Sequence, residues 1–199
     1  MKYSVAVIIP TYNRARTLRR ALESVFGQTR QPDEVCVIDD GSTDSTEVLV
    51  KEHFPQVIYI RQQNLGVSAA RNAGVEATSS DCVAFLDSDD EWLPKKLEVQ
   101  LSALEASPDI RLVHSNEIWI RNGKRVNQMH KHKKSGGYIF PLCLPLCAIS
   151  PSAAVLHRSL LADVGGFDES LPACEDYDLW LRICCKERVL YVDTPLLMK

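Results

Sequence analysis

The sequence lacks any apolar run close to the roughly 20 residues that a membrane-spanning helix needs. Its start, "MKYSVAVIIPTYN", is interrupted by Pro10 and has no small-residue cleavage site, so we do not expect a secretory signal. The net charge is only −3, which by itself favours neither nucleic acid nor an anionic lipid surface as a partner. Repeats, low-complexity stretches and a linker rich in proline and glycine are also missing, so we expect one domain.

The seven cysteines do not have the spacing of a metal site. Cys143 and Cys147 are four residues apart, but no second pair stands at zinc spacing, so we interpret them as structural. Several others lie in apolar segments, which is typical of reduced, buried thiols in a cytosolic protein. We therefore expect a cytoplasmic location.

The 199 residues, 45% of them hydrophobic, are enough for a substantial core, and the first hundred alternate between two patterns. Apolar runs predict strands near residues 5–9, 34–38, 57–60 and 82–86. Segments with helical spacing separate them, for example residues 17–28 and a helix from about Pro94 to Ala106. Four strand–helix units predict an α/β fold with a central, mainly parallel sheet flanked by helices.

Beyond Pro108 this alternation ends. The stretch "DIRLVHSNEIWI" predicts a longer strand, and Asn122-Gly123 is a strong signal for a hairpin turn. We expect residues 108–199 to form a mixed second half, joined to residues 1–107 within one domain. The apolar "LYVDTPLLM" runs directly to Lys199, so a chain shortened at its C-terminus is one interpretation.

Polar residues follow all four predicted strands. The strands end in "PTYNR", "DDGSTD", "QQNLG" and "DSDD". In open α/β sheets, ligands bind outside the carboxyl ends of the strands, so these four segments are expected to meet around one site. The first turn has neither a GxGxxG pattern nor a Walker lysine, so a bound nucleotide would need another counter-charge for its phosphates.

The acidic stretch "DSDD" could hold a divalent cation that supplies this charge. In an extended segment Asp87 and Asp89 would point to one side and Ser88 to the other. Two hard oxygen ligands, completed by a diphosphate, suit Mg²⁺ or Mn²⁺. The alternative is that Ser88 or Asp90 caps the next helix while the remaining acids are solvated.

Five stretches together resemble family 2 glycosyltransferases of the GT-A fold: "VIIPTYNR", "VIDDGSTD", "NLGVSAARNAG", "FLDSDDEW" and "GGFDESLPACEDYDLWLR". Their order and spacing cover nearly the whole chain. The resemblance implies inverting transfer of a sugar from a nucleoside diphosphate, most often UDP, to an acceptor hydroxyl. It further implies a nucleotide-binding half at about 1–107 and an acceptor-side half at about 108–199. The acceptor would be a saccharide or a lipid-linked saccharide, which the protein could meet at the inner face of the membrane.

The resemblance also assigns roles to residues of the donor side. It places the donor base against Thr11 and Tyr12, with Asp40 at the edge of the base, although Asp39 or Asp40 could equally be part of a turn and helix cap. It gives Asp87 to the ribose and Asp89 to the metal. For Arg71 it implies contact with the donor or with the metal-binding carboxylates, whereas without it Arg71 would be a surface residue paired with an acid.

On the acceptor side, the resemblance makes Asp176 the general base, with Glu175 as the runner-up. The segment "ACEDYDLWLRICC" predicts a helix from Glu175, in which Asp178 and Arg182 form an ion pair at i,i+4. Asp176 has no basic residue at that offset, although a first-turn acid can also simply favour the helix dipole. Trp180 is either a core residue or a platform for a sugar.

The basic stretch 121–140 is either a solvated loop or a lid over an anionic acceptor. Its His130 and His132 have the spacing of a metal pair, but nothing else in the sequence supports that role.

A sugar nucleotidyltransferase would need a glycine-rich basic signature after the first strand, which "PTYNRART" is not. A non-catalytic nucleotide-sugar binding module is the other alternative.

Overall fold

The structure, a computed structural model, describes residues 2–199. Its strands are β1 (Val5–Thr11), β2 (Glu34–Asp39), β3 (Ile58–Arg61), β4 (Cys82–Phe85), β5 (Glu91–Trp92), β6 (Leu112–Arg121), β7 (Lys124–Val126), β8 (Ala154–His157) and β9 (Leu190–Met198). Its helices are α1 (Ala15–Phe26), α2 (Thr46–His53), α3 (Val67–Glu76), α4 (Lys96–Glu105), η1 (His130–His132), α5 (Phe140–Cys143), η2 (Pro151–Ala153), α6 (Arg158–Val164) and α7 (Glu175–Cys184).

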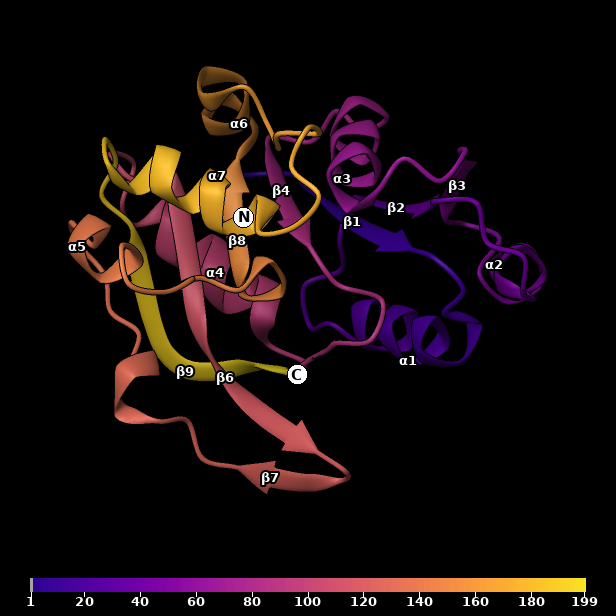
Figure 1. The fold of residues 1–199 in the computed structure, drawn as a ribbon, viewed down its shortest axis with the longest axis horizontal. Helices are drawn as coiled ribbons and strands as arrows, with labels where there is room; N and C mark the ends of the chain where they lie inside the picture. Colours follow the sequence, from indigo (N-terminus) through magenta and orange to yellow (C-terminus); the bar gives the residue numbers. More distant parts are fainter. Residues whose placement is uncertain (1) are drawn as a thin grey trace.

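One sheet runs through the described chain in the order β3-β2-β1-β4-β8-β6-β9-β5, with β7 paired to β6 (Figure 1). The first four strands are parallel. Strand β8 runs antiparallel between β4 and β6, whereas β6 and β9 are again parallel. The predicted α/β fold, a mainly parallel sheet with a mixed second half, is therefore confirmed.

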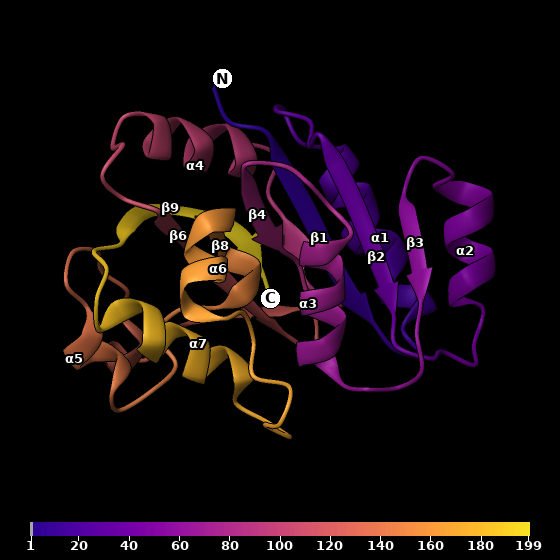
Figure 2. The same cartoon turned by 90° about the horizontal axis from the view of Figure 1, so that it is seen from above.

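Helices cover both faces of the sheet (Figure 2). The alternation of β1 explains how: Val7 and Ile9 pack on the side of α1 and α4, whereas Ile8 packs on the side of α3, α6 and α7. All three side chains are fully buried, each worth about 1.5–3 kcal/mol of hydrophobic free energy. Helix α3 lies so close that a Cβ at Gly74 would overlap the side chain of Ile8.

Most element boundaries differ from the prediction by one or two residues, and β6 begins three residues after the start of the predicted strand. The helix expected at 17–28 is α1, which begins at Ala15, and the strand expected at 57–60 is β3. The hairpin turn is confirmed, because Asn122 and Gly123 both have positive φ, 51° and 72°, between β6 and β7. Among residues 2–199 no helix has the length and apolar character to span a bilayer.

Candidate functional site

The carboxyl ends of β1 and β2 form one wall of a cavity of about 410 Å³. Thr11 is the last residue of β1, and Tyr12, the next residue, is 48% exposed. The loop before α3 and the first turns of that helix form the other wall. The full lining is Pro10, Thr11, Tyr12, Asp40, Asn64, Gly66, Val67 and Ala70. Three of the predicted donor residues therefore share one cavity.

The two aspartates at the end of β2 have different surroundings. Asp39 is buried and accepts hydrogen bonds from the Ser42 main chain (2.7 Å) and the Tyr59 hydroxyl. Asp40 lines the cavity and accepts N–H groups of Leu65 and Gly66, both at 2.9 Å. Of the two, Asp40 is thus the one that can reach a ligand, while its carboxylate also fixes the loop before α3.

The acidic loop after β4 is a turn, which corrects the expected alternation of side chains. The Asp90 N–H donates to the Asp87 carbonyl at 3.0 Å, so the segment is not extended. Asp89 points to solvent, whereas Ser88 and Asp90 are buried. The turn, and not strand alternation, therefore directs Asp90 away from solvent. The Asp90 carboxylate does not cap a helix N-terminus, because α4 begins at Lys96.

Burial, and then the charge of Asp87, raise the pKa of Asp90 to about 7. The loop consequently carries less negative charge near neutral pH than its sequence suggests. Positive charge also comes from Lys199, whose ammonium donates to Ser150 Oγ at 3.1 Å. Desolvation opposes the charged form of Lys199, but the negative charges of Asp90, Asp87, Glu117 and Asp176 together outweigh it and raise the pKa of Lys199. No motif in the sequence marked this lysine as part of the site.

Arg71 joins a segment predicted for the donor side to a segment predicted for the acceptor side. Its guanidinium lies 2.8 Å from Asp87 Oδ1 and 2.7 Å from Glu175 Oε1, and its side chain is only 4% exposed. The guanidinium carbon Cζ lies over the ring of Phe167, 5.1 Å from the ring centroid. The reading of Arg71 as a surface residue is wrong, because the residue is a buried bridge between the loop after β4 and the first turn of α7.

Because Arg71 neutralises two partly buried carboxylates, we expect Arg71→Met to lower the free energy of unfolding by about 3 kcal/mol. Lys51→Met is the matched control, since Lys51 forms an exposed i,i+4 pair with Glu47 at 2.6 Å and should change stability by at most about 0.5 kcal/mol. Urea unfolding of both variants measures the difference. Equal stabilities for the two variants would contradict a bridging role for Arg71.

Asp176 lies in the first turn of α7, one residue beyond the Arg71 bridge. Its Oδ1 accepts the Tyr177 N–H at 2.7 Å, and its Oδ2 lies 3.5 Å from Cys147 Sγ. Within residues 2–199 no lysine or arginine forms an ion pair with it. The Glu175 side chain, by contrast, is 14% exposed and held by Arg71. The predicted pair of Asp178 and Arg182 is present at 2.6 Å.

Trp180 cannot serve as a sugar platform, because its side chain is fully buried. It packs with Leu179 and Ile183 in the hydrophobic core on the α7 side of the sheet. Of the two interpretations of Trp180, the structure supports the core residue.

The side-chain oxygens that could bind a divalent cation form only part of a metal site. The described residues contain no group of three His, Cys, Asp or Glu side chains able to hold a metal. His130 and His132 of η1 are therefore not part of such a group either. The Asp89 carboxylate makes no hydrogen bond or ion pair within residues 2–199, and Asp87 keeps one oxygen not held by Arg71. Mg²⁺ is commonly bound by one or two carboxylates, with substrate phosphates and water completing its shell, and this arrangement matches that pattern.

Two solved structures share the fold. S. aureus TarS 1–349 in complex with UDP-GlcNAc matches 98% of this chain and 58% of its own, with a TM-score of 0.80 and 23% identity. The mannosyltransferase PcManGT of Pyrobaculum calidifontis, in complex with GDP-Man and Mn²⁺, matches all of this chain and 57% of its own, with a TM-score of 0.75 and 21% identity. At these identities the likeness establishes the fold alone.

Sequence comparison reaches further. An uncharacterized glycosyltransferase of Rickettsia felis is 34% identical over 194 residues, covering 96% of this chain but only 32% of that protein, so the chain spans about a third of its length. E. coli WfgD, named UDP-Glc:alpha-D-GlcNAc-diphosphoundecaprenol beta-1,3-glucosyltransferase, is 33% identical over 183 residues, covering 91% of this chain and 70% of that protein. The sequence model of Glycosyl transferase family 2 matches residues 6–165. The chain therefore belongs to glycosyl transferase family 2 and has the GT-A fold.

Proposed function

We propose that this chain is an inverting glycosyltransferase that moves a sugar from a nucleoside-diphosphate sugar, with a UDP-sugar as the favoured donor, to an acceptor hydroxyl with the help of a divalent metal. The Arg71 bridge carries the proposal. It ties Asp87, two residues before the free carboxylate of Asp89, to Glu175, the neighbour of Asp176. The bridge thus joins the segment of the proposed metal ligand to the segment of the proposed base, although the two are far apart in the sequence.

On the donor side, Tyr12 offers an exposed ring for stacking against the nucleotide base. Asp40 lines the same cavity and can accept the imide N–H of uracil. Asp87 is assigned to the ribose. Arg71 positions the Asp87 carboxylate by donating a hydrogen bond to one of its oxygens. The UDP-GlcNAc in the TarS structure and the UDP-Glc in the name of WfgD support a UDP-sugar as donor.

On the acceptor side, Asp176 takes the proton of the attacking hydroxyl. At the same time, the hydroxyl oxygen bonds to the anomeric carbon while the bond from that carbon to the diphosphate breaks. Asp89 would hold Mn²⁺ or Mg²⁺, which when bound neutralises charge on the departing diphosphate. Glu175 is the weaker candidate for the base, because its carboxylate already pairs with a guanidinium. The division into a nucleotide-binding half at 1–107 and an acceptor half at 108–199 follows from these assignments.

A non-catalytic nucleotide-sugar binding module would share the donor cavity but would need no base. The side chain of Asp176, only partly buried and free of any ion pair within residues 2–199, favours the enzyme over the module. A carboxylate that no cation holds in an ion pair is available to accept a proton.

Thermal unfolding with UDP-glucose, GDP-mannose and dTDP-glucose, each with and without Mn²⁺, tests the donor assignment. A nucleotide sugar at a hundred times its Kd stabilises the folded protein by about 2.7 kcal/mol, which is a rise of roughly 5–10 °C in Tm at this chain length. We expect the largest rise with UDP-glucose and Mn²⁺. If none of the three donors raises Tm with Mn²⁺ present, the proposed function is wrong.

Tyr12→Ala should lower donor affinity by at least about fivefold, since stacking of a base on an aromatic ring contributes about 1–3 kcal/mol. Tyr138→Ala is the control, because Tyr138 is also an exposed tyrosine but does not line the donor cavity. Calorimetry with UDP measures both affinities. Equal affinities would remove Tyr12 from the donor site.

A further inference from the structure

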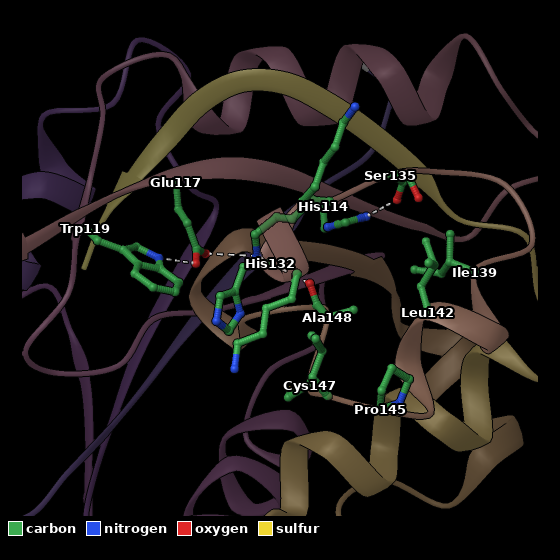
Figure 3. A pocket seen from close by; sticks show the side chains of 14 residues that line it. His114, Glu117, Trp119, His132, Ser135, Ile139, Leu142, Pro145, Cys147 and Ala148 are labelled. Carbon is green, nitrogen blue, oxygen red and sulfur yellow. Dashed lines mark hydrogen bonds and ion pairs between the residues drawn. The ribbon is translucent and has the colours of Figure 1, made fainter. Parts of the chain in front are cut away.

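A second cavity, of about 360 Å³, lies between β6 and the basic stretch 121–140 (Figure 3). Figure 3 shows the polar side chains of β6, among them His114 and Glu117, facing the apolar side chains of Leu142 and Pro145. The lining is His114, Glu117, Trp119, Lys131, His132, Lys133, Lys134, Ser135, Ile139, Leu142, Pro145, Leu146, Cys147 and Ala148. We refer to it as the basic cavity.

The basic cavity lies next to the proposed base, which does not itself line it but touches one of its lining residues. Cys147, one of its lining residues, places Sγ 3.5 Å from Asp176 Oδ2. A saccharide whose reacting hydroxyl lies at Asp176 could therefore extend into this cavity. None of the residues lining the donor cavity lines the basic cavity, so the two can be occupied together.

One buried lining group is an unused hydrogen-bond acceptor. His114 is fully buried, and its Nε2 lies 2.9 Å from the Ser135 carbonyl, which can only accept, so Nε2 carries the proton. Burial, with Lys134 adding to it, lowers the pKa of His114 to about 3, so the ring is neutral and Nδ1 keeps its lone pair. Within the described residues Nδ1 has no partner. Because this atom is closed to solvent, His114 forms part of the wall of the cavity and is not assigned to the ligand.

The cations around the cavity exceed the acids. Residues 121–135 contain six lysines and arginines and no acid. Lys134 is neutralised, because its buried ammonium lies 3.1 Å from Glu117. Lys131 and Lys133 also line the cavity, both exposed, and within residues 2–199 neither forms an ion pair. Two unpaired ammonium groups at one cavity favour a ligand with about two negative charges.

We propose that the basic cavity binds a phosphate monoester carried by the acceptor saccharide, with Lys131 and Lys133 on the phosphate. A phosphate monoester carries about −1.5 to −2 charges near neutral pH, which matches two lysines better than the single charge of a carboxylate does. Leu142 and Pro145 offer an apolar surface for the carbon face of the sugar. This inference rests on the proposed function, since it takes Asp176 as the base beside the cavity.

Calorimetry with glucose 1-phosphate, and with methyl glucoside as the uncharged probe, tests the proposal on the whole chain. We expect glucose 1-phosphate to bind at low salt and methyl glucoside to bind at least ten times more weakly. The double variant Lys131→Gln, Lys133→Gln should weaken binding of glucose 1-phosphate at least tenfold. The matched control is Lys124→Gln, Arg125→Gln, which removes the same charge from β7 of the same stretch but does not touch the cavity lining.

UDP titrated with Mn²⁺ separates this proposal from the donor site. UDP affinity should be the same in both double variants, because neither changes the donor cavity. If the wild-type protein binds UDP but not glucose 1-phosphate, the inference is overturned and the proposed function still stands. Equal loss of glucose 1-phosphate binding in both variants would also overturn it, because the effect would then be general charge. Vesicles of phosphatidylcholine and phosphatidylglycerol in equal parts supply the membrane arm. If only vesicles bind, and do so through Lys131 and Lys133, these lysines serve a lipid surface and the inference is wrong.

Discussion

Asp176→Asn should lower kcat by roughly 10²–10⁴ while leaving the Kd of the donor within about twofold of the parent. The substitution keeps the size of the side chain and removes only the oxygen that accepts the proton. Folding should be preserved, since the contacts of Asp176 are a hydrogen bond from its neighbour's N–H and a contact with Cys147. Transfer turnover and calorimetry with UDP, measured on the same preparation, check the two halves of this prediction.

Two neighbouring acids are the controls. Asp178→Asn should cost no more than about 1 kcal/mol of stability through its partly exposed pair with Arg182, and should keep its turnover. Glu175→Gln should lower stability through the Arg71 bridge and lower turnover less than Asp176→Asn does. Should Asp176→Asn turn over normally while Glu175→Gln is inactive, the base is Glu175.

Asp89→Asn should nearly abolish transfer and remove the part of donor binding that depends on Mn²⁺. Asp89 is the exposed acid of the loop after β4 and has no hydrogen bond or ion pair on its carboxylate within residues 2–199. An amide is a much poorer ligand for a hard cation than a carboxylate, so a bound metal would lose its main protein ligand. UDP binding without Mn²⁺ should change little. Turnover equal to that of the parent would refute the metal role.

Asp90→Asn is the matched control one residue away. Asp90 is buried, with its pKa raised to about 7, so an amide resembles its protonated form and the fold should tolerate the change. Because the carboxylate does not face solvent, Mn²⁺-dependent binding should persist. A loss of Mn²⁺ dependence in Asp90→Asn, together with its retention in Asp89→Asn, would transfer the metal role to Asp90.

Strands β1, β2 and β4 of the parallel half were predictable because they are buried on both faces and therefore have continuous apolar runs. The meeting of Thr11, Tyr12 and Asp40 followed from the rule that carboxyl ends of parallel strands share one edge. The geometry of the acidic loop did not follow, because alternation holds only for extended backbone, and the hydrogen bond from Asp90 to Asp87 closes a turn. Local periodicity cannot reveal such a bond.

Contacts between residues far apart in the sequence were the least predictable part of the site. The pair of Arg71 and Glu175 joins residues 104 positions apart, and Lys199 reaches the acids from the end of β9. Neither side chain has a local pattern that names its partner. Trp180 is a different case: Leu179, Trp180 and Ile183 lie on one face of α7, and this apolar spacing would have favoured the core over a sugar platform.

A crystal structure of the chain with UDP and Mn²⁺ tests the central claim, a donor site at the carboxyl ends of β1, β2 and β4, most directly. We expect the uracil ring against Tyr12 with its imide N–H near Asp40. We expect Mn²⁺ bonded to the Asp89 carboxylate and to the diphosphate, with the Arg71 bridge intact. A nucleotide bound in the basic cavity between Lys133 and His114, or Mn²⁺ bound away from Asp89, would contradict the account.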